Sequence, residues 1–186
     1  MHIKIKFATS NFHKASEVKE ILSHHSISVE HINLKVPEIQ SDNLEEIAKA
    51  SSIEVVKREH VPIIVEDSGL FIKNLNGFPG PYSSYVQKTI GNAGILKLMI
   101  NIRKREATFK SVIAFCNEKL SPNIFVGEVY GVISEEKRGK IWGFDPIFIP
   151  KGMEETFAEI PVKKKNDLSH RKKALEKFVS WYKSRY

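Results

Sequence analysis

Strand-like and helix-like segments alternate along the first part of the chain. Apolar residues alternate with polar ones over residues 3–7, as in a strand, and then recur at helical spacing over residues 15–22. The same patterns predict a second strand near residues 32–36, a helix over residues 44–55 and a third strand over residues 61–65. Strands that alternate with helices form parallel or mixed sheets, which bind ligands at their strand ends. The pattern therefore predicts an α/β fold.

The pattern changes after the third predicted strand. The segment NLNGFPGPYSSY, residues 74–85, is rich in Gly, Pro and Asn and predicts an ordered loop, and apolar spacing predicts a helix over residues 95–102. Residues 107–133 have the composition of two consecutive long strands, which predicts an antiparallel pair at the base of a second lobe. Residues 174–182 predict an amphipathic helix. Because no repeat, low-complexity segment or linker interrupts residues 1–186, we expect a single domain with two lobes.

The composition argues against a membrane protein. Hydrophobic residues make up 41% of the chain and charged residues 27%. No stretch approaches the roughly 18 consecutive apolar residues of a membrane span. The first residues, MHIKIKFATSN, predict a strand and not a secretory signal, and the single cysteine, Cys116, is predicted to be a packed core thiol. We therefore expect a cytoplasmic protein.

The net charge of +7 is compatible with a nucleic acid, a membrane surface or a small polyanion as the partner. The densest basic run, KKKNDLSHRKK at residues 163–173, contains helix-capping residues and no aromatic residues that could stack on bases. This distribution favours a local site for a small anion, with neither a nucleic acid nor a membrane as the partner.

The segment TSNFHK, Thr9 to Lys14, lies between the first predicted strand and the first predicted helix. Hydroxyl and amide side chains, the free N–H groups of a helix start and a lysine one turn later together favour phosphate binding. The alternative is that Ser10 or Asn11 simply caps the helix while Lys14 lies in solvent. The sequence leaves both interpretations open.

Two adjacent carboxylates, Glu66 and Asp67, follow the third predicted strand. Burial of an ionised carboxylate without a partner is costly, so each needs a compensating group. If Glu38, in the segment VPEIQ, reaches the same sheet edge as Asp67, the two carboxylates form a site of the kind that Mg²⁺ prefers. The alternative is that Asp67 and Ser68 cap a turn and that Glu66 pairs with a lysine.

The segment SHR, at the predicted start of the last helix, concentrates positive charge where the helix dipole disfavours it. Ser169 is the predicted N-cap, and His170 and Arg171 then fill the first turn. An anion at this position accounts for the crowding. The alternative, a solvated face of a terminal helix, explains the following lysines better than it explains SHR.

In the segment WGFDPIF, Trp142 to Phe148, one aromatic residue lies on each side of a glycine, and Asp145 and a proline follow. Such a segment can stack on a planar base and bind its edge through a carboxylate or backbone groups. The alternative is ordinary core packing. Together, the four segments supply the parts that bind a nucleoside triphosphate.

With these residues in view, the sequence resembles the noncanonical purine nucleoside triphosphate pyrophosphatases, the inosine triphosphatase or HAM1-like family. The segments TSNFHK, PEIQ, VEDSGL, GFPGPYSS, GFDPIF and KNDLSHRKKAL occur in the family's order across nearly the whole chain. The resemblance implies an elongated, two-lobed mixed-sheet α/β fold with a central nucleotide-binding cleft, and a homodimer. It also implies Mg²⁺-dependent hydrolysis of ITP, XTP and deoxy-ITP to the monophosphate and pyrophosphate, which cleanses the nucleotide pool.

The resemblance also implies roles for individual residues. Glu38 and Asp67 match the metal ligands, and Asp67 matches the residue that accepts a proton from the attacking water. The substrate-binding set matches Thr9, Ser10, Asn11, Phe12, His13, Lys14, Ser68, Trp142, Gly143, Phe144, Asp145, Lys165, His170 and Arg171. Within it, His170 and Arg171 match the pair at the purine edge.

The chain departs from the family pattern at three positions. Ser51 stands where many relatives have a phosphate-facing lysine, and an arginine common after the PGxYS segment is missing near Tyr85. Phe144 stands where the family often has Trp or Tyr, which removes a hydrogen-bond donor but retains the aromatic ring. These departures concern the finer substrate contacts and not the reaction class.

Two rival functions remain at this stage. A Maf-like pyrophosphatase shares the general architecture and acts on modified pyrimidine or methylated nucleotides, although SHR and GFDP argue against it. A basic single-strand nucleic-acid-binding module predicts salt-sensitive oligonucleotide binding without turnover.

Overall fold

The structure, a computed structural model, describes residues 3–185, so Met1 and His2 of the N-terminal segment and Tyr186 lie outside it. It confirms the predicted α/β class. The chain divides into two compact units: unit 1 comprises Met1–Asp67, Ser111–Gly127 and Arg171–Tyr186, and unit 2 comprises Ser68–Lys110 and Glu128–His170. Within the described residues, no helix combines the length and the apolar character that a membrane crossing requires.

The strands form a mixed sheet in the order β2-β1-β3-β5-β6-β7, with β4 paired to β3. Their bounds are β1 Ile3–Ala8, β2 Ile27–Ile32, β3 Ile63–Ile72, β4 Pro79–Gly80, β5 Glu106–Cys116, β6 Asn123–Ile133 and β7 Phe148–Pro150. β1 pairs in parallel with β2 and β3, whereas β3–β4 and β6–β7 are antiparallel. The connection between neighbouring β5 and β6, residues 117–122, is too short for a parallel crossover. The predicted antiparallel pair of long strands is therefore present.

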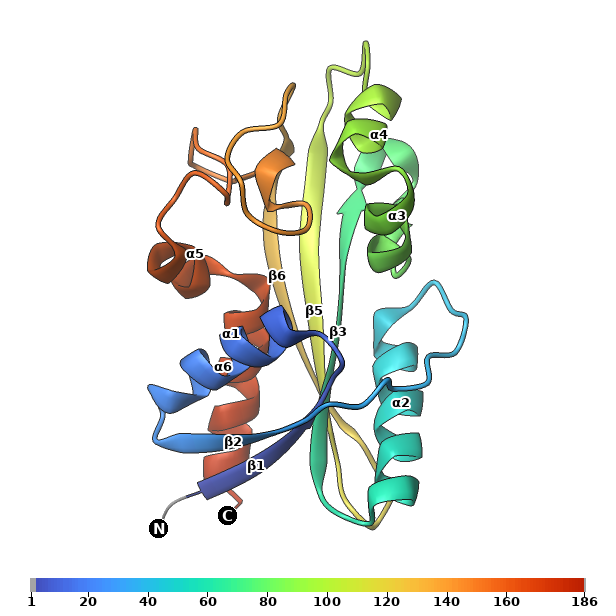
Figure 1. The fold of residues 1–186 in the computed structure, drawn as a ribbon, viewed down its shortest axis with the longest axis vertical. Coiled ribbons are helices and arrows are strands. Elements are labelled where there is room, and N and C mark those ends of the chain that lie inside the picture. Colours follow the sequence, from blue (N-terminus) through green and yellow to red (C-terminus); the bar gives the residue numbers. More distant parts are fainter. Residues whose placement is uncertain (1–2, 186) are drawn as a thin grey trace. The chain divides into compact units, whose positions relative to one another are not determined.

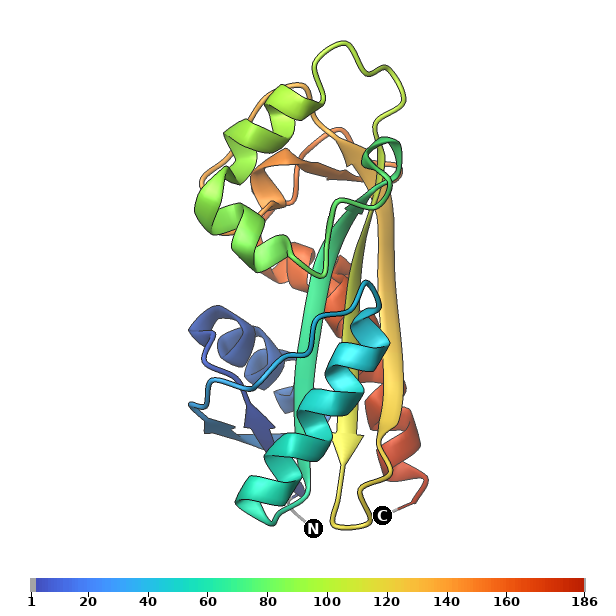
Figure 2. The same cartoon turned by 90° about the vertical axis from the view of Figure 1, so that its right-hand side faces the viewer.

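In unit 1, helices cover both faces of the sheet. The helices are α1 Phe12–Ser23, α2 Leu44–Glu59 and α6 His170–Lys183, of which α6 belongs to unit 1 from Arg171 onward. α1 and α6 lie on one face of β3, and α2 lies on the other (Figures 1 and 2). Apolar residues of α1, α6, β1, β3 and β5 share one core, including Phe7, Ile64 and Phe178. The periodic apolar faces predicted for these helices are therefore the faces that they bury.

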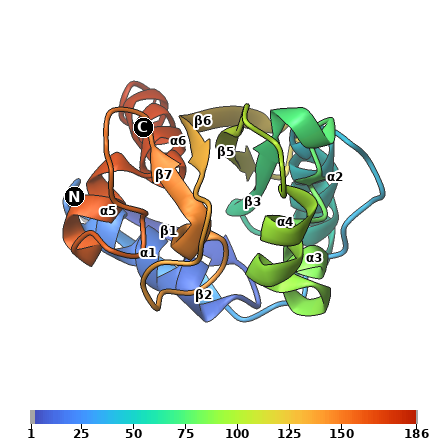
Figure 3. The same cartoon turned by 90° about the horizontal axis from the view of Figure 1, so that it is seen from above.

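Unit 2 has its own core. Its helices are α3 Ser83–Thr89, α4 Gly91–Leu98 and α5 Val162–Leu168, with short 3-10 helices η1 Lys73–Leu75 and η2 Asp145–Ile147. α3 and α4 follow one another directly, and β7 runs along β6 (Figure 3). The core packs three phenylalanine rings together, Phe109, Phe148 and Phe157, with ring centroids 4.6 to 6.0 Å apart.

Three element boundaries differ from the sequence-based prediction. The second strand is Ile27–Ile32 and not residues 32–36, because parallel pairing with β1 fixes its register from Ile3↔Ile27 to Ala8↔Ile32. The predicted helix at residues 95–102 begins earlier and is Gly91–Leu98. The predicted loop at residues 74–85 is regular in part, since it contains the end of η1, β4 and the start of α3.

The third strand is longer than predicted and continues through both carboxylates to Ile72. Asp67 and Ser68 are therefore strand residues and do not cap a turn. Gly69 permits this course, because a Cβ at that position would lie 2.2 Å from the carbonyl oxygen of Gly80 on β4. Ser83 links β3 and β4, because its Oγ accepts a hydrogen bond from the Leu70 N–H at 2.8 Å and donates one to the Gly80 main-chain oxygen at 2.7 Å.

Candidate active site

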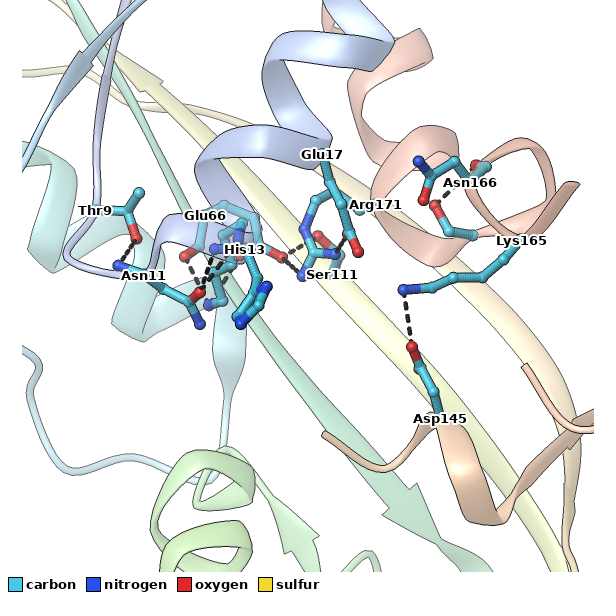
Figure 4. Close-up of polar contacts among 12 residues, drawn as sticks. Thr9, Asn11, His13, Glu17, Glu66, Ser111, Asp145, Lys165, Asn166 and Arg171 are labelled. Atoms are coloured by element: carbon cyan, nitrogen blue, oxygen red, sulfur yellow. Dashed lines mark hydrogen bonds and ion pairs between the residues drawn. The ribbon is translucent and has the colours of Figure 1, made fainter. Parts of the chain in front are cut away.

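The turn between β1 and α1 is built by its own side chains. Asn11 is the N-cap of α1, and its Oδ1 accepts hydrogen bonds from the N–H groups of His13 and Lys14 at 3.0 and 3.2 Å. Thr9 Oγ1 in turn accepts from Asn11 N–H at 3.1 Å (Figure 4). Thr9 is buried, whereas Ser10, Phe12 and His13 are exposed. The capping interpretation is therefore correct for Asn11, and three side-chain hydrogen bonds hold the turn.

The capping alternative also placed Lys14 in solvent, and the structure shows that this part is wrong. Its side chain is 17% exposed, and its Nζ lies 2.9 Å from Oε2 of Glu66. The same Nζ donates to the main-chain oxygen of Glu66 at 3.4 Å. β1 ends at Ala8, opposite Val65, so the turn that carries Lys14 begins beside the continuation of β3.

Glu66 is fully buried and receives side chains from three other elements (Figure 4). Besides Lys14 on α1, Ser111 on β5 donates to Oε1 at 2.7 Å and Arg171 on α6 places Nη2 3.2 Å from the same oxygen. Burial alone would raise the pKa of Glu66, but Arg171 and Lys14 outweigh it and hold the pKa well below its ordinary value. This buried carboxylate is therefore ionised and matched by cations.

Arg171 is almost as deeply buried as Glu66, with 1% of its side chain exposed. Besides Glu66, it donates a hydrogen bond from Nη1 to Oε2 of Glu17 on α1. One guanidinium thus contacts two carboxylates, which its five N–H donors allow. We call Lys14, Glu17, Glu66, Ser111 and Arg171 the buried charge cluster.

Asp67 follows Glu66 but belongs to the opposite face of β3, because successive side chains of a strand alternate. It is half-buried, and its charge still acts on Lys14. Burial would lower the pKa of Lys14, but Glu66 and Asp67 outweigh it, so the pKa is raised above its ordinary value. Lys14 therefore remains charged at neutral pH.

The other predicted metal ligand, Glu38, lies exposed in residues 33–43, which connect β2 to α2. Ser51 on α2 is buried, and its Oγ donates to the main-chain oxygen of Pro37 at 2.8 Å. This bond ties the residue before Glu38 to α2, the helix on the face of β3 to which Asp67 belongs (Figure 2). Ser51, one of the positions at which the sequence departs from the pattern that the resemblance implies, thus has a structural contact of its own.

Among residues 3–185, no group of three or more His, Cys, Asp and Glu side chains is arranged to hold a metal ion. Mg²⁺ does not require such a group, since it commonly binds one or two carboxylates together with water and substrate phosphates. Glu66 is engaged by the buried charge cluster, whereas Glu38 and Asp67 are the carboxylates that the sequence predicts as Mg²⁺ ligands. Their donor chemistry fits a hard cation.

In unit 2, the predicted base-binding residues form a turn that leads into η2. Phe144 and Asp145 are buried and Trp142 is partly exposed. Lys165 on α5 lies 2.8 Å from Oδ2 of Asp145 (Figure 4), and its Nζ lies 5.5 Å from the centroid of the Trp142 ring. The structure thus brings Trp142, Asp145 and Lys165 together.

His170 stacks on Phe109, with ring centroids 4.8 Å apart and ring planes inclined by 8°. Ser169 immediately precedes α6 in extended backbone conformation, at the predicted N-cap position. Ser68 lies on β3, at the first residue of unit 2. The imidazole of His170 thus packs nearly parallel to the Phe109 ring.

Sequence reasoning missed several contributors to these arrangements. Glu17 lies three residues after Lys14, so both fall on one side of α1, and this spacing was an available signal. The alternation of the strand puts Ser111 on one face with the apolar residues Phe109 and Ile113, and a polar residue in such a position needs a partner. The stacking of Phe109 on His170 had no signal in the sequence.

Comparison with known proteins gives consistent results. The Ham1 family model matches residues 5–181. A dITP/XTP pyrophosphatase of Methanopyrus kandleri is 52% identical over 98% of this chain and 97% of its own. One of Methanothermobacter marburgensis is 47% identical over 99% and 98%, respectively.

Solved structures agree in fold. The Staphylococcus aureus Ham1 protein superposes with a TM-score of 0.85 at 28% identity, covering 98% of this chain and 100% of that one. A HAM1 protein from Coxiella burnetii also gives a TM-score of 0.85, at 30% identity over 98% and 99% of the two chains. With near-complete coverage by the family model, the curated relatives and these folds, the chain belongs to the Ham1 family.

Proposed function

We propose that the protein is a Mg²⁺-dependent nucleoside triphosphate pyrophosphatase that hydrolyses ITP, deoxy-ITP and XTP to the monophosphate and pyrophosphate. Its role would be the removal of noncanonical purine nucleotides from the nucleotide pool. The observation that carries the proposal is the buried charge cluster, which positions Lys14 next to the strand that carries Asp67. The relatives named dITP/XTP pyrophosphatase, at 52% and 47% identity, support the substrate class.

The turn from Thr9 to Lys14 is proposed to bind the phosphates. The ammonium group of Lys14 has three N–H donors, and it directs two contacts to Glu66, one to the carboxylate and one to the main-chain oxygen. A third donor remains for a phosphate oxygen. Asn11 fixes the backbone of the turn, while Ser10, Phe12 and His13 extend its exposed surface. A positive charge held in this way stabilises charge that develops on a phosphoryl group.

Asp67 is proposed to accept the proton of the water that attacks the α-phosphorus. A carboxylate oxygen is a suitable acceptor for the proton of a water molecule that lies within hydrogen-bond reach. Glu38 and Asp67 would hold Mg²⁺, which when bound neutralises phosphate charge and polarises the attacked phosphoryl group. The bond from Ser51 to Pro37 supports this assignment, because it fixes the backbone next to Glu38.

Residues of unit 2 are proposed to bind the purine. The Trp142 ring offers a stacking surface, and Phe144 anchors the turn in the core. Asp145 and Lys165 form an ion pair, and both are proposed to contact the nucleoside. Ser68 is proposed as a further contact.

Selectivity is proposed to come from His170 and Arg171, which would donate to the 6-oxo group of hypoxanthine or xanthine. Adenine presents a 6-amino donor instead, so a buried mismatch would disfavour ATP. Two features support a fixed donor geometry. His170 stacks on Phe109, and Arg171 contacts the carboxylates of Glu17 and Glu66.

The protein is proposed to act in the cytoplasm as a homodimer, with the nucleotide as its partner and without nucleic acid or membrane. The match to the Ham1 family over residues 5–181 disfavours both rivals, the Maf-like pyrophosphatase and the nucleic-acid-binding module.

Product analysis tests the proposed bond cleavage. Incubation with ITP and Mg²⁺, followed by chromatographic separation of the nucleotides and assay of the phosphate products, should give inosine monophosphate and pyrophosphate in equal amounts. Attack at the α-phosphorus gives this pair. Accumulation of inosine diphosphate with orthophosphate would place the cleavage at the terminal phosphate and contradict the proposal.

A further inference from the structure

We infer that Asn92 is a positioning residue for the turn Trp142 to Asp145. The inference rests on the proposed function in one respect only, namely that this turn binds the purine. Asn92 lies in the first turn of α4, and none of the sequence motifs includes it. Its contact with the turn joins residues that are 51 positions apart in the chain.

The contact is a hydrogen bond from Nδ2 of Asn92 to the main-chain oxygen of Gly143 at 3.1 Å. Gly143 adopts a φ of +70°, and a Cβ built on it would meet no described atom within 4 Å. Packing around this point of the turn is therefore loose on that side. Glycine adopts positive φ without strain but also adopts many other conformations, so it does not by itself hold the turn in one of them. The bond from Asn92 holds the Gly143 carbonyl in the observed position.

The remaining atom of the amide shows that an asparagine at this position carries a cost. Asn92 is 8% exposed, and its Oδ1 is buried without a hydrogen-bond partner among the described residues. Rotation of the amide would not help, since Oδ1 would then face the Gly143 oxygen, an acceptor against an acceptor. A leucine of similar size would avoid the buried oxygen. The presence of asparagine thus points to a role for its N–H donor.

The rest of the turn is fixed in other ways. Phe144 belongs to the same core as Ile95 of α4, and Asp145 is held by Lys165. Trp142 is the partly exposed residue at the start of the turn, and Gly143 joins it to these anchors. Loss of the Asn92 bond should therefore loosen the Trp142 ring and leave the core of unit 2 intact.

Kinetics provide the first test. Asn92→Ala and Asn92→Leu should raise KM for ITP about three- to tenfold, the usual effect of one lost hydrogen bond, while kcat changes by less than about twofold. Asn74→Ala is the matched control, because Asn74 is in the same unit and its Nδ2 also donates to a main-chain carbonyl, that of Lys104. It should leave both constants unchanged. An unchanged KM in both Asn92 variants, with folding confirmed by Tm, would overturn the inference.

Fluorescence provides a test that does not depend on turnover. The chain has two tryptophans, and Trp181 packs against Phe115 and Phe125 in the core of unit 1, so Trp181→Phe leaves Trp142 as the reporter. In that background, Asn92→Ala should lower the anisotropy of Trp142 in the absence of nucleotide. Unchanged anisotropy would overturn the positioning role.

Different measurements decide the proposed function and the positioning role of Asn92. The proposed function fails if the Trp181→Phe parent neither hydrolyses ITP nor changes its Trp142 emission when inosine monophosphate is added. The positioning role is still decided by the anisotropy of the nucleotide-free protein, which requires no substrate.

Discussion

Replacement of Asp67 by asparagine is expected to lower kcat for ITP hydrolysis by at least about a hundredfold, the lower range for loss of a general base. The amide cannot accept the proton of the attacking water and is a poorer ligand for Mg²⁺ than a carboxylate. The fold should survive, because Asp67 is only half-buried and lies outside the buried charge cluster. Initial rates at saturating ITP and Mg²⁺, together with Tm from thermal unfolding, measure both effects.

Asp42→Asn is the matched control for this variant. Asp42 is exposed in the connection before α2, and the same chemical change there should leave kcat near the wild-type value. A rate near that of the wild type in Asp67→Asn would remove Asp67 from the mechanism. A large drop in Tm would instead assign the residue a structural role.

The second large effect is expected at Glu66, and it is an effect on stability. Glu66→Gln leaves Arg171 and Lys14 without the carboxylate that they share. Removal of one partner from a buried ion pair typically costs about 3–5 kcal/mol. For a chain of this size, such a loss lowers Tm by roughly 6–20 °C. Thermal unfolding at pH 7 measures the difference.

The same pair of proteins should show a characteristic pH dependence. Because the folded-state pKa of Glu66 is depressed, its ionisation stabilises the folded wild type above the unfolded-state pKa, about 4.3 for a glutamate. That contribution is lost as the pH falls from there through the folded-state pKa. The gap in Tm between wild type and Glu66→Gln should therefore be full at pH 7 and should narrow below about pH 4.

Two further variants keep this prediction testable. Glu30→Gln breaks an exposed pair with Lys4, whose atoms lie 2.8 Å apart, and should change Tm little at any pH. Lys14→Met should destabilise the wild type more than it destabilises Glu66→Gln, because the interaction that it removes is already absent there. Equal effects of Lys14→Met in both backgrounds would show that the two residues do not interact.

The periodic elements could be predicted from the sequence because each buries one regular face. This holds for α1, α2 and α6, and for the long strands β5 and β6. The second strand was misplaced because Leu34 and Val36 continue an apolar alternation that has no partner strand. Pairing with β1 stops at Ile32. Register is a property of two strands together, and one strand's sequence does not contain it.

At the candidate site, too, the sequence did not show which residues pair with one another. The sequence indicated that Glu66 needs a compensating group, but it did not identify Arg171 or Ser111 as those groups. Lys14 and Glu66 are 52 positions apart, and Glu17 and Arg171 are 154 apart. Local propensity and spacing do not reach such distances. The residue types of the site were thus predictable, whereas the pairs that they form required the fold.

The most direct test of the proposed activity is pyrophosphate release from ITP, XTP, GTP and ATP, each measured with and without Mg²⁺ in one assay. We expect fast Mg²⁺-dependent release from ITP and XTP, with GTP and ATP left nearly intact. Release from none of the four, or equal release from ATP and ITP, would contradict a pyrophosphatase selective for noncanonical purines.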